Sequence, residues 1–134
     1  MQSLLSLVSY LVFESSSLIL VAAYFASHLL SDDGLFVLTG AKVASKGCPT
    51  AFATGYGMSK AATHQLAVDF ESNIANSSQI AFCILPTTID TPANRAAMPD
   101  ANFGEWSTPE SIAEKIYQWS ADSSTRPEHL FVDV

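Results

Sequence analysis

A tyrosine and a lysine lie four residues apart in the segment Gly55-Tyr56-Gly57-Met58-Ser59-Lys60. On an α-helix this spacing puts both side chains on one face, one turn apart. A free tyrosine has a pKa of about 10 and is a poor proton donor at neutral pH. A lysine ammonium about 4 Å away contributes roughly 4 kcal/mol at an effective dielectric of about 20, enough to lower the pKa of the phenol by about two to three units. The pair therefore predicts a proton donor that works beside a hydride-supplying cofactor.

The pair by itself is weak evidence, because most tyrosine–lysine pairs at this spacing are unrelated surface residues. Its meaning depends on the elements around it. The 134-residue chain is long enough for one small domain or for part of a larger one. Hydrophobic residues make up 49% of it but charged residues only 14%, against about 25% in an ordinary soluble domain. This balance predicts surfaces that meet a partner, a membrane or further chain.

The charge and the cysteines exclude several classes of protein. A net charge of −7 argues against nucleic-acid binding, which needs a basic surface to contact phosphates. Two cysteines, Cys48 and Cys83, fit neither a disulfide framework nor a zinc site. We therefore expect a reducing, cytoplasmic compartment and no metal, with Cys83 in the core.

The N-terminal part of the chain carries an apolar tract over residues 4–30, interrupted by Glu14 and three serines. The stretch after the serines is too short to cross a membrane and has no positively charged flank. A buried or interface helix over residues 15–30 is the favoured interpretation, with the serines as its N-cap and Ser31-Asp32-Asp33-Gly34 as its end. A membrane-anchored segment is the less favoured alternative, and residues 1–14 receive no assignment.

Short apolar runs predict the strands on either side of the pair. The runs at 35–39 and 80–85 have the length and composition of fully buried strands, and residues 130–134 predict a third strand. A helix between the first two is expected over residues 57–72, with an apolar stripe at helical spacing as its packed face. That stripe consists of Met58, Ala62, Leu66 and Phe70. Two buried strands joined through a helix predict a βαβ unit in a parallel sheet.

The segment after the second strand, residues 86–92, is expected at the carboxyl edge of the sheet, where ligands bind in open α/β folds. Residues 93–106 are polar and irregular, and they predict a lid over such a site. The sequence Ser107-Thr108-Pro109-Glu110 predicts the start of a helix, with a capping box and an early proline. His64 shares a helix face with Lys60, and we expect it to be a solvated histidine.

Four blocks of residues, taken together, resemble the second half of a short-chain dehydrogenase/reductase, and within that family the dihydropteridine reductases. The likeness runs from about Ser15 to the end of the chain. The blocks are Gly40-Ala41-Lys42, Gly55-Tyr56-Gly57-Met58-x-Lys60 with His64-Gln65-Leu66, Ile89-Asp90-Thr91-Pro92-x-Asn94-Arg95, and Met98-Pro99-x-Ala101-x-Phe103-x-x-Trp106. Each block is short, but the set is specific.

The resemblance implies an oxidoreductase that uses NADH or NADPH to reduce a quinonoid dihydropteridine (a dihydropterin) to the tetrahydropteridine, the step that regenerates tetrahydrobiopterin. Tyr56 and Lys60 would be the catalytic pair, and Lys60 would also hold the ribose hydroxyls of the nicotinamide. Together with Pro86 and Thr88, the same pair would bind the cofactor. Most members of the family carry a catalytic serine after the first of these strands. This chain has Ala41 there, which resembles the dihydropteridine reductases.

The family's dinucleotide-binding strand, glycine-rich turn and helix have no counterpart in this sequence, whose one Gly-x-Gly is Gly55-Tyr56-Gly57. We therefore expect a partial Rossmann-like, three-layer α/β fold with a parallel sheet that lacks the N-terminal βαβ unit. Residues 15–134 would form the C-terminal half of a reductase domain, and the reduction is not expected to be complete in this chain alone. The alternative is a non-catalytic fragment. The resemblance places the helix at 15–30 and the tyrosine–lysine helix in the family's dimer interface, so such a chain would form a homodimer or associate with a full-length reductase.

Overall fold

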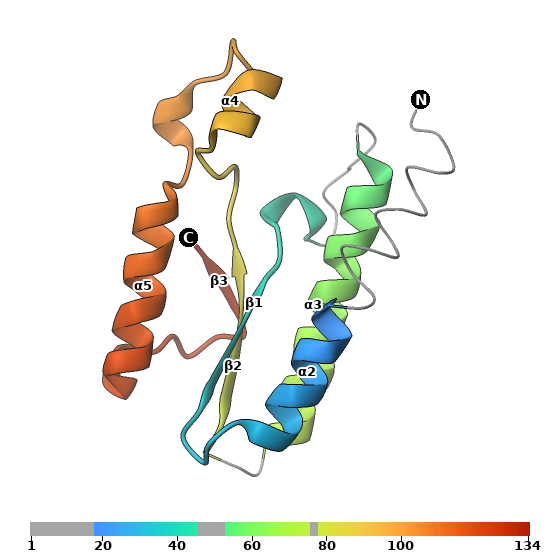
Figure 1. The fold of residues 1–134 in the computed structure, drawn as a ribbon, viewed down its shortest axis with the longest axis vertical. Coiled ribbons are helices and arrows are strands. Elements are labelled where there is room, and N and C mark those ends of the chain that lie inside the picture. Colours follow the sequence, from blue (N-terminus) through green and yellow to red (C-terminus); the bar gives the residue numbers. More distant parts are fainter. Residues whose placement is uncertain (1–17, 46–52, 76–77) are drawn as a thin grey trace.

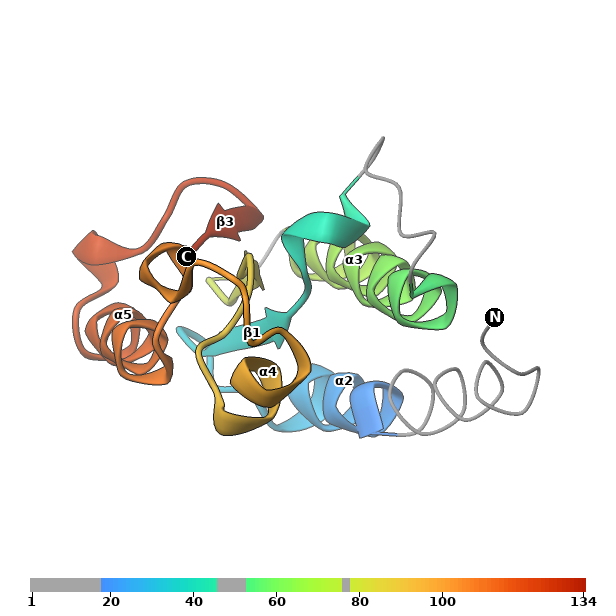
Figure 2. The same ribbon diagram turned by 90° about the horizontal axis from the view of Figure 1, so that it is seen from above.

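The computed structural model describes the chain in three ranges, residues 18–45, 53–75 and 78–134. Three features discussed above lie outside these ranges: the unassigned segment 1–14, the serine cap at 15–17 and Cys48. Within them, three strands form one parallel sheet in the order β1-β2-β3, with helices on both faces (Figures 1 and 2). The predicted three-layer α/β architecture is confirmed.

The strands lie where the apolar runs predict them. β1 spans Leu35–Thr39, β2 spans Ile80–Leu85 and β3 spans Phe131–Asp133, which is shorter than the predicted 130–134. The central strand, β2, is buried at every position after its first residue. The prediction of full burial is wrong for β1, of which only Leu38 is buried. The physical reason is its place at one edge of the described sheet, where it has a strand neighbour on one side.

Two helices cover one face of the sheet and a third covers the other. α2 spans Leu18–Leu29 and α3 spans Thr54–Ile74 on one side, and α5 spans Pro109–Ala121 on the other (Figure 2). Successive residues of β2 alternate between the two layers, as the pleat of a strand requires. Its even-numbered residues pack toward α5, where the rings of Phe82 and Trp119 lie 5.5 Å apart between centroids. Its odd-numbered residues, including the buried Cys83, pack toward α3 and α2.

α3 differs from the prediction in its bounds and in its packed face. It begins at Thr54 rather than at 57, and Met58 and Ala62 of the predicted apolar stripe are exposed. The buried stripe in the described helix beyond its two glycines consists instead of Ser59, Thr63, Ala67 and Phe70. Small side chains let the helix lie close to the sheet. The hydroxyls of Ser59 and Thr63 donate to carbonyl oxygens one turn earlier in the same helix, at 2.8 and 3.2 Å, so neither is buried without a partner.

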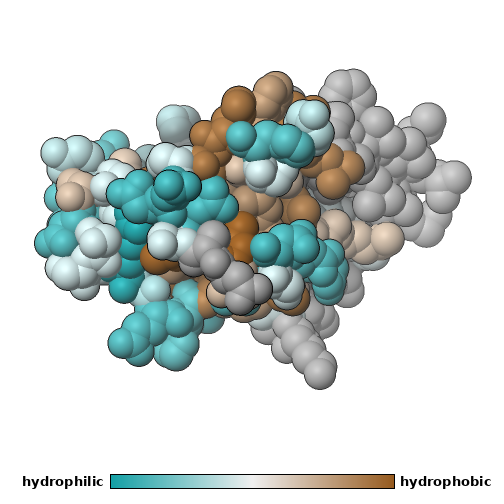
Figure 3. Space-filling model, turned by 90° about the horizontal axis from the view of Figure 1, so that it is seen from below, coloured by the Kyte–Doolittle hydropathy of each residue, from teal (hydrophilic) through white to brown (hydrophobic). Residues whose placement is uncertain are grey.

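α2 is mostly exposed, which corrects the prediction of a buried helix. Of its side chains described for burial, only Ala26 is buried, whereas Tyr24 is 63% and Leu29 is 74% exposed. Among the side chains described for burial, Ala26 packs in one cluster with Phe70 of α3 and Ala81 of β2. The space-filling view shows hydrophobic surface on this side (Figure 3). Its role as an interface helix stays a prediction. In the part of the chain that the structure describes, no helix is both long and apolar enough to cross a membrane.

The segment predicted to be an irregular lid contains two short helices. α4 spans Pro92–Ala97, and a single 3₁₀ turn follows at Phe103–Glu105. Both ends of the segment are tied together at Ser107, whose N–H donates to the Thr88 carbonyl and whose carbonyl accepts from the Asp90 N–H, each at 2.9 Å. The segment between Asp90 and Ser107 therefore begins and ends at the same place on the edge of the sheet.

The N-terminus of α5 is capped one residue later than predicted. The hydroxyl oxygen of Thr108 accepts a hydrogen bond from the Ser111 N–H at 3.1 Å. The predicted capping box would have used Ser107 for this purpose, but the Ser107 hydroxyl donates to the carbonyl oxygen of Val134 at 2.7 Å. The helix start is confirmed, and the identity of its cap is corrected.

Candidate active site

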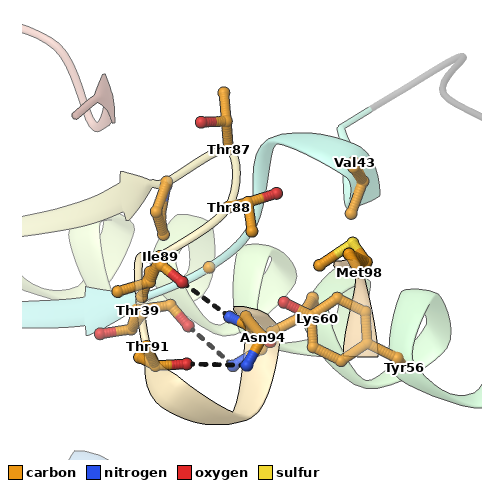
Figure 4. Close-up of a pocket in the computed structure, with 12 residues that line it drawn as sticks. Thr39, Val43, Tyr56, Lys60, Thr87, Thr88, Ile89, Thr91, Asn94 and Met98 are labelled. Carbon is orange, nitrogen blue, oxygen red and sulfur yellow. Dashed lines mark hydrogen bonds between the residues drawn. The ribbon is translucent and has the colours of Figure 1, made fainter. Parts of the chain in front are cut away.

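A pocket of about 410 Å³ lies at the carboxyl edge of the sheet, where β1 and β2 end (Figure 4). Its walls come from the turn after β1, the N-terminal half of α3, the loop after β2, and α4 with the residue that follows it. All four residues given a role from the sequence line it, namely Tyr56, Lys60, Pro86 and Thr88. The structure brings these residues together, and the roles assigned to them stay predictions.

Tyr56 and Lys60 lie one turn apart on α3, and both side chains are half-buried. The Nζ atom of Lys60 lies 5.7 Å from the centroid of the Tyr56 ring, within the range of a cation–π contact. The same Nζ donates a hydrogen bond to the carbonyl oxygen of Thr39 at 3.2 Å. Lys60 therefore connects the phenol ring to the end of β1.

The turn after β1 forms the floor of the pocket, and its backbone is held at each successive residue. The N–H groups of Gly40 and Lys42 donate to carbonyl oxygens of β2 and of Pro86, at 2.9 and 3.1 Å. Between them, the N–H of Ala41 donates to Nε2 of His64 at 3.2 Å. Ala41 is fully buried and brings no hydroxyl to this floor.

His64 is not the solvated histidine that the sequence predicted. It is half-buried, and its ring lies 5.4 Å from that of Phe131 between centroids. Burial, and to a lesser extent the charge of Lys60, lower the pKa of His64 below its ordinary value. A backbone N–H only donates, so the Nε2 atom that accepts from Ala41 must be unprotonated.

The opposite wall is fixed by Asn94 and by an ion pair. The Nδ2 atom of Asn94 donates to the carbonyl oxygen of Ile89 at 2.8 Å, and the N–H of Asn94 donates to the hydroxyl of Thr91, the N-cap of α4. Arg95 binds the carboxylate of Asp90 through two nitrogens, the longer contact being 2.7 Å. These contacts set the direction in which α4 leaves the loop.

The pocket residues that were given no role from the sequence include Val43, Asn94 and Met98. Asn94 and Met98 belong to blocks that carried the family resemblance, and that was the available signal. Val43 had none, because its place depends on how the turn after β1 folds back. Among the described residues, no three His, Cys, Asp or Glu side chains are grouped so as to hold a metal ion.

No family model matches the chain. It is 42% identical, over 108 residues, to a dihydropteridine reductase of Dictyostelium discoideum. The match covers 79% of this chain and 46% of that relative, so the chain spans less than half of the relative's length.

Two solved structures show the same fold. An angucycline C-6 ketoreductase, LanV, with bound NADP, has a TM-score of 0.76 at 18% identity over 98% of this chain and 53% of that one. A short-chain dehydrogenase from Salmonella enterica serovar Typhi has a TM-score of 0.60 at 28% identity, over 77% of this chain and 42% of that one. Bound NADP, NADPH or NADH occurs among such neighbours.

The fold and these similarities show that the chain belongs to the short-chain dehydrogenase/reductase family. Within this family, the chain is similar to a dihydropteridine reductase, as the four sequence blocks predicted. Because less than half of that relative is matched, its activity does not pass to this chain by similarity alone.

Proposed function

We propose that this chain carries the proton-donating half of an NAD(P)H-dependent reductase site whose substrate is a quinonoid dihydropteridine. The observation that carries the proposal is the convergence of Tyr56, Lys60, Pro86 and Thr88 on one pocket, in a chain 42% identical to a dihydropteridine reductase. The reaction adds a hydride and a proton to the substrate and yields the tetrahydropteridine.

The pocket residues fit the nicotinamide end of the cofactor, which supplies the hydride when it is bound. The ammonium of Lys60 has three N–H donors, and the carbonyl oxygen of Thr39 takes one of them, so the same group can bind ribose hydroxyls. Gly40 adds no side chain to the floor, which lets a flat ring approach the backbone. Pro86 and Thr88 offer backbone and hydroxyl groups to a carboxamide. These residues favour neither NADH nor NADPH.

Tyr56 is the proton donor in this proposal. The positive charge of Lys60 beside the ring stabilises the phenolate that remains after the proton leaves, which favours proton transfer to the substrate. Ala41 brings no hydroxyl to the floor of the pocket, so the phenol group acts without the serine that most family members use. α4, held by Asn94, closes the side of the pocket where the pterin would enter.

Cofactor binding tests the first half of the proposal. NADH and NADPH are titrated separately into the 134-residue chain while backbone amide signals are recorded by NMR. Saturable binding is expected for at least one of them, with the largest shifts at Thr39, Lys60 and Thr88. Lys60→Met should weaken binding, whereas Lys115→Met, an exposed lysine on α5, should not. A folded chain that binds neither dinucleotide would contradict the proposal.

A second candidate function is association without catalysis. It is favoured by five large apolar residues of α2 that are each at least half exposed, which we call the α2 face. They are Leu20, Val21, Tyr24, Phe25 and Leu29. Exposed apolar patches of this kind mark interfaces in soluble proteins. The partner would be a second copy of the chain or a full-length reductase.

A further inference from the structure

Gly40 and His64 fit against each other at the floor of the pocket. A Cβ atom placed on Gly40 would overlap Nε2 of His64 and would lie 2.7 Å from Sγ of Cys83. A side chain at this position would force a neighbour to shift, because the imidazole and the thiol already fill the space. Gly40 lines the pocket but His64 does not, so the imidazole contacts Gly40 outside the pocket.

The backbone on both sides of Gly40 is attached to α3 by side chains four residues apart. Lys60 donates to the carbonyl oxygen of Thr39 at 3.2 Å, and His64 accepts from the N–H of Ala41 at 3.2 Å. Residues at this spacing lie on one face of a helix. A single turn of α3 thus holds the Thr39-Gly40-Ala41 turn from one side, and the N–H groups of Gly40 and Lys42 hold it through β2 and Pro86.

We propose that His64 is a positioning residue: its neutral imidazole holds the Thr39-Gly40-Ala41 turn in place, and protonation of the ring releases that turn. An imidazolium has two donors and no acceptor, so the N–H of Ala41 would lose its partner. Ala41 is 1% exposed, and a buried N–H without a partner is costly. The protonated ring would also add a second positive charge next to Lys60.

The groups around the ring favour its neutral form. Lys60, on the same helix, opposes a positive charge on His64, as does burial. On β2, burial raises the pKa of the Cys83 thiol to about 11, so this group brings no negative charge at neutral pH. At the end of β3, the carboxylate of Asp133 is paired with Lys42, at 2.7 Å.

The sign of the pH dependence follows from the lowered pKa. Between the ordinary value of 6.5 and the lowered value in the folded chain, the unfolded state binds more protons than the folded state. The contribution of His64 to stability is therefore complete above pH 6.5 and is lost as the pH falls through the lowered pKa. Cofactor affinity should fall over the same range, a consequence that rests on the proposed function because Thr39 and Gly40 line the pocket.

The direct test follows two NMR signals of the wild-type chain across a pH titration. These are the Cε1 proton of His64 and the backbone amide of Ala41. The proposal expects them to titrate with one shared midpoint below 6.5. It also expects the protection factor of the Ala41 amide, which is its exchange rate relative to an unprotected amide at the same pH, to fall roughly fivefold or more once the ring is protonated. An Ala41 amide that does not change while His64 titrates would overturn the proposal.

Two variants distinguish the role of His64 as a hydrogen-bond acceptor from the role of its bulk. His64→Gln keeps an acceptor at a similar distance but does not titrate, so the Ala41 amide should stay protected at every pH. His64→Leu keeps bulk without an acceptor, so the amide should be unprotected at every pH. Equal protection of Ala41 in the two variants would contradict the proposal. The wild-type titration does not depend on either variant folding.

NADH affinity measured in the same samples distinguishes this inference from the proposed function. If His64 and Ala41 titrate together and NADH affinity falls with them, both are supported. If they titrate together but neither NADH nor NADPH binds at any pH, the positioning role stands and the cofactor proposal fails. If a dinucleotide binds but the signal and exchange of the Ala41 amide do not change as His64 titrates, the positioning role fails.

Discussion

The ammonium of Lys60 donates a hydrogen bond to the carbonyl oxygen of Thr39, at 3.2 Å, and so joins the N-terminal half of α3 to the last residue of β1. The same ammonium lies 5.7 Å from the centre of the Tyr56 ring. The Lys60 side chain therefore contributes to the fold through its bond to Thr39, and to the chemistry of the site through its charge beside the Tyr56 ring. Substitutions at Lys60 should affect both the stability of the fold and the binding of the dinucleotide. The size of each effect depends on whether the hydrogen-bond donor, the charge or both are removed.

Lys60→Met should lower the free energy of unfolding by about 1 kcal/mol, because the carbonyl of Thr39 loses its donor. It should also weaken NADH binding by about tenfold or more, since the charge is lost as well. Lys60→Arg keeps a charge and a donor, and should recover most of the stability but less of the binding, because a guanidinium does not reproduce the position of an ammonium. Urea unfolding and NADH titration measure the two effects. NADH binding by Lys60→Met at wild-type strength would contradict the assignment.

Gly40→Ala should destabilise the chain by about 1–3 kcal/mol, the range for overpacking in a close-packed interior. The added Cβ would meet the imidazole of His64 and the thiol of Cys83, so at least one of these side chains would have to shift. Gly104→Ala is the matched control, since its Cβ would approach only the side-chain oxygen of Asn102, at 3.3 Å. Urea denaturation compares the variants.

The same clash predicts coupling between two positions. Adding His64→Ala to Gly40→Ala removes the imidazole that the new methyl group meets, so the double variant should lose less stability than the sum of the single variants. If the stability losses of the two single variants simply add up in the double variant, the imidazole is not the group that excludes a side chain at Gly40.

The ion pair between Asp90 and Arg95 should make the stability of the α4 region depend on pH. The hydrogen bond from Arg95 lowers the pKa of Asp90 below its ordinary value of 3.8. Its contribution to stability is therefore complete above pH 3.8 and is lost as the pH falls through the lowered pKa. The difference in melting temperature between wild type and Asp90→Asn should be largest near neutral pH and should shrink in acid. A difference that is constant with pH would contradict this, and Asp100→Asn serves as the exposed control.

If the α2 face is an interface, Val21→Glu combined with Phe25→Glu should abolish it. These residues lie one turn apart and are 50% and 52% exposed, so charges there should leave the fold of the monomer intact. Sedimentation velocity should show concentration-dependent association of the wild-type chain and a monomer for the double variant. A wild-type chain that stays monomeric would contradict self-association, and one that also fails to bind an added full-length reductase would contradict the whole second candidate.

The strands and the core of the site could be predicted from the sequence because their signals are local. The run Ile80–Leu85 has the composition of a buried strand, and the spacing of Tyr56 and Lys60 decides by itself that they share a helix face. Their meeting with Pro86 and Thr88 follows from one topological fact, that parallel strands end at the same edge of a sheet.

What could not be predicted depends on how elements pack. The apolar stripe of α3 led to the wrong face, because Ser59 and Thr63 are buried with their hydroxyls satisfied inside the helix, which polarity alone does not reveal. His64 was taken as solvated because nothing local indicates that its ring fits beneath Gly40, 24 residues earlier in the chain. α2 was taken as buried because its composition is apolar, and composition does not say whether the surface that covers it belongs to the same chain.

The central claim is that Tyr56 donates the proton in a reductase site on this chain. The most direct test is NADH and NADPH oxidation by the purified chain with a quinonoid dihydropteridine, comparing wild type with Tyr56→Phe and with Tyr117→Phe, an exposed tyrosine on α5, as the control. Because the chain carries the proton-donating half of the site, the account predicts that turnover is retained in Tyr117→Phe and falls about a hundredfold or more in Tyr56→Phe, with dinucleotide affinity retained. Turnover that survives Tyr56→Phe would contradict it.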